Sequence, residues 1–193
     1  MDAEHERTVL DRAMALFAKE ELRDFTLDQL TEASGIPSAH IIRRFHSSEN
    51  ILKAVLSREL EAIAATAEPL TVGETLANGL GALAAVILEG YRRRRPLLTR
   101  LLGESMRDPH VGAIFYSTFV AGGRHIISEF LRARAASGEV REDLDIETAA
   151  SMFFAALMSL LLSDSDKLDE DRALRGTCET FLRGVARNPP PQR

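Results

Sequence analysis

Residues 26–49 read TLDQLTEASGIPSAHIIRRFHSSE, and this stretch decides how the N-terminal region folds. Thr26 and Gln29 have the spacing of a capping box, in which two side chains satisfy backbone N–H groups at a helix start. Gly35 can end that short helix in the left-handed conformation. Pro37 suits the first turn of a following helix, where a missing N–H costs little. Two short helices joined by a tight turn predict a helix-turn-helix.

The second of these helices, over residues 37–45, is expected to have two different faces. Ile41 and Phe45 lie four residues apart, so they should pack inward. The outer side should carry small, apolar and cationic groups: Ser38, Ala39, Ile42 and Arg43, flanked by His40, Arg44 and His46. Arginines and the hydroxyl of Ser47 can contact phosphate, and Ile42 can meet a thymine methyl. A solvated charged face is the alternative interpretation of the same spacing.

Apolar periodicity predicts helix along nearly the whole chain and gives no signal for strand pairs. Helices are expected at about 3–20, 26–35, 37–45, from Ser47 into the sixties, 74–93, 97–106, 109–136, 145–163 and 169–187. Pro69 and Gly73 should mark the joint before the helix at 74–93. The fold class is therefore all-α with about nine helices, and the tail NPPPQR is expected to be disordered.

Charge and cysteine content limit the function classes. The chain of 193 residues has a formal net charge of −5, and its first 50 residues hold six Lys and Arg against ten Asp and Glu, a balance of −4. Nucleic-acid contact must therefore come from a local patch. The single Cys178 excludes an intramolecular disulfide, which suits a reducing cytoplasm. Neither the acidic start MDAEHERTVL nor the interrupted apolar segment 146–162 fits a signal peptide or a membrane span, so we expect a cytoplasmic protein.

Residues 7–55 resemble the N-terminal domain of TetR-family transcriptional regulators. The shared pattern is carried by Leu16-Phe17, Thr26, Ser34-Gly35-Ile36, Ile41-Ile42, Phe45 and Ser47-Ser48-Glu49. The resemblance implies a homodimeric repressor of double-stranded DNA, with the helix at 37–45 in the major groove and a C-terminal domain that binds a small effector. It implies a DNA-contact set of Thr26, Ser38, Ala39, His40, Ile42, Arg43, Arg44, His46 and Ser47. The expected domains are a helix-turn-helix domain over 1–48, a ligand-binding and dimerisation domain over 49–187, and a tail over 188–193.

Three positions depart from the family pattern. Ile42 stands where members usually have Tyr, Ser48 where they have Lys, and Pro37 where they have a Ser cap. Phosphate contacts dominate affinity, so these changes predict weaker binding or a changed operator. The alternative function is a TetR-like ligand-binding or interaction protein that has lost sequence-specific DNA binding.

The helix at 145–163 is apolar nearly all round, which predicts burial on two sides. The expected sides are the domain core and a second copy of the chain, although a pure core role fits the same residues. The predicted dimer interface comprises Phe153, Leu157, Leu160, Leu161, Leu174, Cys178, Phe181 and Leu182. Dimerisation would place two recognition helices about 34–36 Å apart on a palindromic operator.

An effector pocket is expected among the middle helices. Its candidate lining is Leu102, Met106, Phe115, Tyr116, Phe119, His125, Phe154 and Met158. Such a lining suits a largely apolar ligand anchored by Tyr116 or His125, and plain core packing is the alternative. We further hypothesise that Gly122 and Gly123 let the helix at 109–136 bend over this pocket.

Other patterns favour structural interpretations. NGLGALAA (78–85) contains Gly-x-Gly-x-x-Ala but follows a predicted helix instead of a strand, so its small residues should serve helix packing. YRRRRP (91–96) fits a helix C-terminus better than a nucleic-acid patch. The histidines lack paired ligand spacing, and no nucleophile–base pair is evident. We therefore expect no metal, no cofactor and no enzyme activity.

Overall fold

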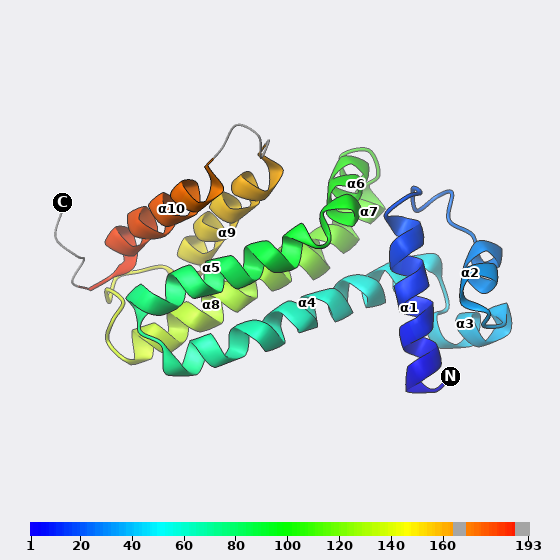
Figure 1. The fold of residues 1–193 in the computed structure, drawn as a ribbon, viewed down its shortest axis with the longest axis horizontal. Helices are drawn as coiled ribbons and strands as arrows, with labels where there is room; N and C mark the ends of the chain where they lie inside the picture. The colour runs from blue at the N-terminus through cyan, green and yellow to red at the C-terminus, as the bar shows by residue number, and fades with distance from the viewer. Residues whose placement is uncertain (164–168, 188–193) are drawn as a thin grey trace. The chain divides into compact units, whose positions relative to one another are not determined.

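The computed structural model describes residues 1–163 and 169–187, and every regular element within them is helical (Figure 1). The elements are α1 (Ala3–Phe17), α2 (Leu27–Ser34), α3 (Ser38–Phe45), α4 (Ser48–Gly73), α5 (Leu76–Arg92), α6 (Arg95–Ser105), α7 (Pro109–Ile114), the π-helical segment η1 (Phe115–Val120), α8 (Ala121–Ala136), α9 (Ile146–Leu162) and α10 (Glu170–Val185). Counting the continuous run from α7 to α8 as one helix gives nine in the described residues. The all-α prediction is confirmed. The tail 188–193 lies outside the described residues.

The chain forms two compact units, which are described separately. Unit 1 contains Met1–Glu61 and Arg94–Val120, and unit 2 contains Ala62–Arg93 and the described residues from Ala121 onward. Helix α4 contributes residues to both units. The units group residues by contact, so the predicted functional boundary between residues 48 and 49 stays a prediction.

The first three helices of unit 1 enclose a common core. Its buried side chains are Val9, Leu10, Ala13, Phe17, Phe25, Leu30, Ile36, Ile41 and Phe45. The rings of Phe17 and Phe25 lie 4.6 Å apart between centroids. Helices α2 and α3 have eight residues each, too few for stability in isolation. Burial of these apolar side chains, about 1.5–3 kcal/mol for each large one, therefore holds them in place.

Carboxylates neutralise most of the arginine run at 92–95. Arg92 and Arg93 pair with Glu89 on the last turns of α5 in unit 2. In unit 1, Arg94 pairs with the nearly buried Glu59 at 2.6 Å, and Arg58 pairs with the other oxygen of Glu59 at 2.8 Å. These pairs favour the structural interpretation of YRRRRP over a nucleic-acid patch.

A buried carboxylate joins α6 to the connection between α1 and α2 within unit 1. The backbone N–H of Leu22 donates to Oε1 of Glu104 at 2.9 Å, and Glu104 is only 4% exposed. Burial raises the pKa of Glu104, the Leu22 hydrogen bond opposes that shift, and Glu21 and Asp108 add to it. Arg107 pairs with Glu21 at 2.9 Å beside it. The α1–α2 connection is therefore anchored to α6 by the buried carboxylate of Glu104.

Unit 2 is closely packed at glycines on α5 and α8. A Cβ at Gly79 on α5 would lie 2.7 Å from the Phe130 ring, and a Cβ at Gly123 on α8 would lie 2.3 Å from Oη of Tyr91 and 2.4 Å from the ring of Phe154. Only hydrogen at these positions lets α5, α8 and α9 approach so closely. The segment NGLGALAA is helical throughout, as predicted, and its first glycine serves packing.

Several helix boundaries differ from the prediction. Pro69 lies inside α4, which continues to Gly73, so the joint falls after Gly73 and not at the proline. Helix α6 begins at Arg95, so Pro96 lies in its first turn, where a residue needs no N–H partner. The long helix at 109–136 changes to π-helical hydrogen bonding over Phe115–Val120, ahead of Gly122 and Gly123. Its irregularity therefore precedes the glycine pair. No helix among the described residues is long and apolar enough to cross a membrane.

Candidate functional site

The turn between α2 and α3 has the local geometry that its sequence predicts. The side chain of Thr26 accepts from the N–H of Gln29 at 3.2 Å, and Oε1 of Gln29 accepts from the N–H of Thr26 at 2.7 Å. Gly35 has a φ of 71°, which favours glycine, and closes α2. Pro37 occupies the N-cap position of α3 instead of its first turn, one residue earlier than predicted. The Thr26 hydroxyl is thus occupied in the capping box at the start of α2.

Helix α3 has one buried and one exposed face. Ile41 and Phe45 are buried, as predicted, while Ile42 is 46% exposed. Ala39, His40, Arg43, Arg44 and His46 are exposed, and Ser38 and Ser47 are half-buried. The predicted contact residues on and beside α3 are therefore exposed or half-buried, while Ile41 and Phe45 alone of that helix are buried.

The two arginines of α3 have different surroundings. Arg43 forms no ion pair with any described residue. The guanidinium of Arg44 donates twice to Glu6 on α1, through Nε to Oε2 at 2.9 Å and through Nη2 to Oε1 at 2.7 Å. Sequence periodicity could not reveal Glu6, because 38 positions separate it from Arg44.

The chain between α3 and α4 is held by hydrogen bonds between side chains and the backbone. The side chain of Ser47 accepts from the N–H of Asn50 at 3.2 Å, as expected for a helix start, and the amide of Asn50 donates to the carbonyl of Phe45 at 2.9 Å. His46 has a φ of 69°, which is uncommon for a residue with a side chain. The sequence predicted the role of Ser47 at the start of α4 and missed that of Asn50.

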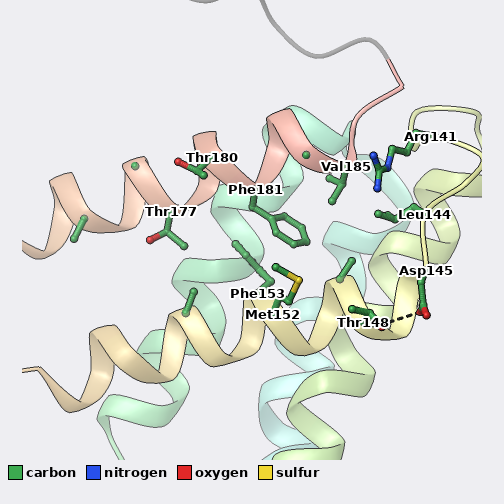
Figure 2. A pocket seen from close by; sticks show the side chains of 15 residues that line it. Arg141, Leu144, Asp145, Thr148, Met152, Phe153, Thr177, Thr180, Phe181 and Val185 are labelled. Atoms are coloured by element: carbon green, nitrogen blue, oxygen red, sulfur yellow. Dashed lines mark hydrogen bonds between the residues drawn. The ribbon is translucent and has the colours of Figure 1, made fainter.

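A second surface feature is a groove of about 880 Å³ between α9 and α10 in unit 2. Figure 2 shows Met152 and Phe153 of α9 facing Phe181 of α10 in its centre. The rings of Phe153 and Phe181 lie 4.5 Å apart between centroids. Met152 is 66% exposed. Along α10 the groove is lined by small residues: Ala173, Gly176, Thr177, Thr180 and Gly184. The groove is therefore apolar and open to another surface.

The predicted interface residues divide by exposure. Phe153, Leu157 and Leu161 are buried within the chain itself, as core residues of unit 2. Leu160, Leu174, Cys178, Phe181 and Leu182 are half-buried. Burial raises the pKa of the Cys178 thiol to about 11, so it is not an activated nucleophile. Met152, Thr148 and Thr180 also line the groove and are not among the predicted interface residues. Of these three, only Met152 belongs to the second apolar stripe of α9.

The predicted pocket residues fall in both units. Leu102, Met106, Phe115, Tyr116 and Phe119 belong to unit 1, and His125, Phe154 and Met158 belong to unit 2. Phe119 and Phe154 are buried, whereas Met106, Tyr116 and His125 are exposed. The rings of Phe115 and Phe119 stack with centroids 5.9 Å apart. His125 lies 4.0 Å from Glu129 at the surface. The pocket assignment stays a prediction.

Comparison with known proteins identifies the family. The family described as "Tetracyclin repressor-like, C-terminal domain" matches residues 73–177, more than half of the chain. No curated protein sequence matches the chain.

Solved structures share the fold. GusR of Salmonella enterica has a TM-score of 0.76 at 18% identity, covering 93% of this chain and 94% of its own. FadR of Bacillus subtilis, in complex with stearoyl-CoA, has a TM-score of 0.74 at 17% sequence identity. The match covers 93% of this chain and 98% of FadR. A regulator from Saccharomonospora viridis, in complex with choline, has a TM-score of 0.68 at 18% sequence identity. The match covers 97% of this chain and 100% of that regulator. The helix-turn-helix, the all-α fold and the matched C-terminal domain lead to one conclusion: the chain belongs to the TetR family of transcriptional regulators.

Proposed function

We propose that the protein is a ligand-responsive repressor that binds a palindromic DNA operator as a homodimer in the cytoplasm. The observation that carries this proposal is the exposed face of α3. Ile42 is exposed beside Arg43 while Ile41 and Phe45 hold the helix against its unit. Small, apolar and cationic side chains on a short exposed helix suit the floor and walls of a major groove.

The groove between α9 and α10 supports the homodimer. Met152 is exposed there, and methionine and aromatic side chains are enriched in protein interfaces. The small residues along α10 would let a helix of a second copy approach closely. Two copies joined through these helices would form a four-helix bundle and pair their recognition helices. The half-buried residues Leu160, Leu174, Cys178, Phe181 and Leu182 would complete the interface.

An effector would act by binding two states of the dimer with different affinity. Its binding would favour a state in which the two recognition helices are wrongly spaced for the operator. The candidate pocket residues remain Leu102, Met106, Phe115, Tyr116, Phe119, His125, Phe154 and Met158. The stearoyl-CoA complex of the similar FadR supports a largely apolar effector, whereas choline in the other relative supports a small cation. A thermal-shift comparison of an acyl-CoA with choline would separate these classes, because only a bound ligand raises the unfolding midpoint.

A second candidate function is a ligand-binding or interaction protein without sequence-specific DNA binding. Two observations favour it: Arg44 is already paired with Glu6, and the first 50 residues carry a net charge of −4. Fewer free cations mean fewer phosphate contacts and weaker binding.

Fluorescence anisotropy with duplexes from the DNA flanking the protein's own gene would decide between the two candidates. A repressor should bind one duplex in preference to a scrambled duplex of the same length, with affinity that falls as salt rises. Binding without sequence preference, even at low salt, would refute operator recognition. The Ile42→Ala variant should reduce that preference while its unfolding midpoint stays near that of the wild type, because Ile42 is exposed.

A further inference from the structure

The adjacent arginines of α3 form a natural comparison. Both side chains are exposed, and they differ in the charge beside them. Arg43 has no ionic partner among the described residues, whereas Arg44 meets both oxygens of Glu6 at 2.7 and 2.9 Å. This two-pronged geometry is the strongest arrangement that a guanidinium and a carboxylate form.

Further contacts fix Arg44 in this position. Its guanidinium carbon lies 5.3 Å from the centroid of the Phe45 ring, and that ring is buried. The hydrogen bonds to Glu6 raise the pKa of Arg44 further, so the guanidinium stays charged. The side chain is thus held over its own helix and directed toward α1.

Glu6 has reasons to stay where it is. It lies in the first turn of α1, where acidic side chains are stabilised by the helix dipole, and its side chain is 28% exposed. A DNA phosphate that bound Arg44 in place of Glu6 would leave the Glu6 carboxylate unpaired beside the phosphate. Two negative groups would then lie close together, and their repulsion would offset the new contact.

We propose that Glu6 sequesters Arg44 from the DNA backbone, so that α3 contacts phosphate through Arg43 alone and Glu6 sets the DNA affinity. The inference rests on the proposed binding of an operator. It changes the expected contact set, because Arg44 becomes a positioning residue between α3 and α1.

The test measures DNA affinity against salt concentration, since each phosphate contact contributes about 0.9 to the slope of log K against log salt. Arg43→Ala should flatten the slope by about one contact, and Arg44→Ala should leave it unchanged. Glu6→Ala should free Arg44, steepen the slope by about one contact and tighten binding at low salt. The double variant Glu6→Ala with Arg44→Ala should lose that added steepness.

Glu4→Ala is the matched control. Glu4 lies in the same first turn of α1, is exposed, and forms no ion pair with Arg44, so its removal changes net charge without releasing the guanidinium. A flatter slope for Arg44→Ala would overturn the proposal. A Glu6→Ala slope equal to that of Glu4→Ala would also overturn it.

Two further outcomes separate this inference from the proposed function. If the wild type bound no duplex while Glu6→Ala did, sequestration would be supported and operator binding by the wild type refuted. If neither bound, both would be refuted. A DNA-free measurement checks the contact itself: the Nε–H signal of Arg44 should be protected from solvent exchange in NMR spectra and should lose protection in Glu6→Ala. An Arg44 signal that exchanges as fast as that of Arg43 would overturn the ion pair.

Discussion

Helices α3 and α9 each place a large apolar side chain on the surface, yet the surroundings differ. Ile42 on α3 has small and cationic neighbours, with Arg43 next to it. Met152 on α9 lies in an apolar groove between two helices, beside Phe153 and Phe181 (Figure 2). An apolar side chain among cations suits a base edge, and one among apolar and small residues suits another protein surface. The neighbours of an exposed side chain thus distinguish the two functions better than the side chain itself.

The contrast between α3 and α9 is tested most strongly at Met152, which should lie in a dimer interface. Met152→Glu would put a charge into the apolar groove, so we expect monomers in size-exclusion chromatography with light scattering. Loss of the second half-site should weaken operator binding by about 10²–10⁴-fold. Met106→Glu is the control, because Met106 is exposed but does not line the groove. A Met152→Glu variant that remained dimeric, or a monomeric wild type, would contradict the interface.

The neighbouring isoleucines of α3 test whether one face of this helix is buried and the other exposed. Ile41 is fully buried, so Ile41→Ala should cost about 2–5 kcal/mol of unfolding free energy. Ile42→Ala should change stability by less than about 0.5 kcal/mol. Urea denaturation of both variants measures the difference. Equal losses would mean that α3 does not present the face described above.

The packing beneath α9 can be tested at two glycines. Gly123→Ala would push a methyl group into Tyr91 and Phe154 and should cost about 1–3 kcal/mol. Gly81→Ala on α5 meets nothing within 4 Å and should stabilise the protein by up to about 1 kcal/mol. Thermal unfolding would show midpoints moving in opposite directions, and parallel shifts would refute the close approach of α8 and α9.

The smallest expected effect concerns Glu104 in unit 1. Because burial raises its pKa, the folded state binds the proton more tightly than the unfolded state. Its stabilising contribution is complete at pH values below the unfolded pKa, near 4.5, and is lost as pH rises through the folded pKa. Glu104→Gln keeps an oxygen for the Leu22 N–H, so it should unfold at a higher temperature than the wild type at pH 8.

The pH series supplies the check on Glu104. The difference in unfolding temperature between Glu104→Gln and the wild type should shrink as the pH falls toward 4. There the wild-type carboxyl is protonated and is therefore neutral, like the amide of the variant. Glu104→Ala removes the acceptor of the Leu22 hydrogen bond and should be less stable at every pH. A difference between the Gln variant and the wild type that stayed constant from pH 4 to 8 would contradict the raised pKa.

Local patterns in the sequence predicted the helix-turn-helix well. Thr26 with Gln29, Gly35, and the pair Ile41 and Phe45 act over a few residues, so their spacing alone indicates their roles. The ion pair of Arg44 with Glu6 could not be predicted in this way, since it depends on how α3 packs against α1.

Burial on α9 could be predicted only in part for the same reason. A helix that is apolar nearly all round does not indicate which stripe faces its own core. Phe153 and Leu157 lie in that core because α5, α8 and α10 pack against α9, and these helices leave Met152 exposed. The partners of a helix, and not its composition, select its free face.

The π-helical segment Phe115–Val120 has a consequence for aligning this chain with its relatives. A π turn holds about one residue more than an α turn, and each residue added to a helix rotates the residues after it by about 100°. A relative with an unbroken α-helix here would match α8 only after a one-residue gap within 115–120. An ungapped alignment would place the buried stripe of α8, with Gly123 and Ile127, one residue out of register, about 100° around the helix from its true position.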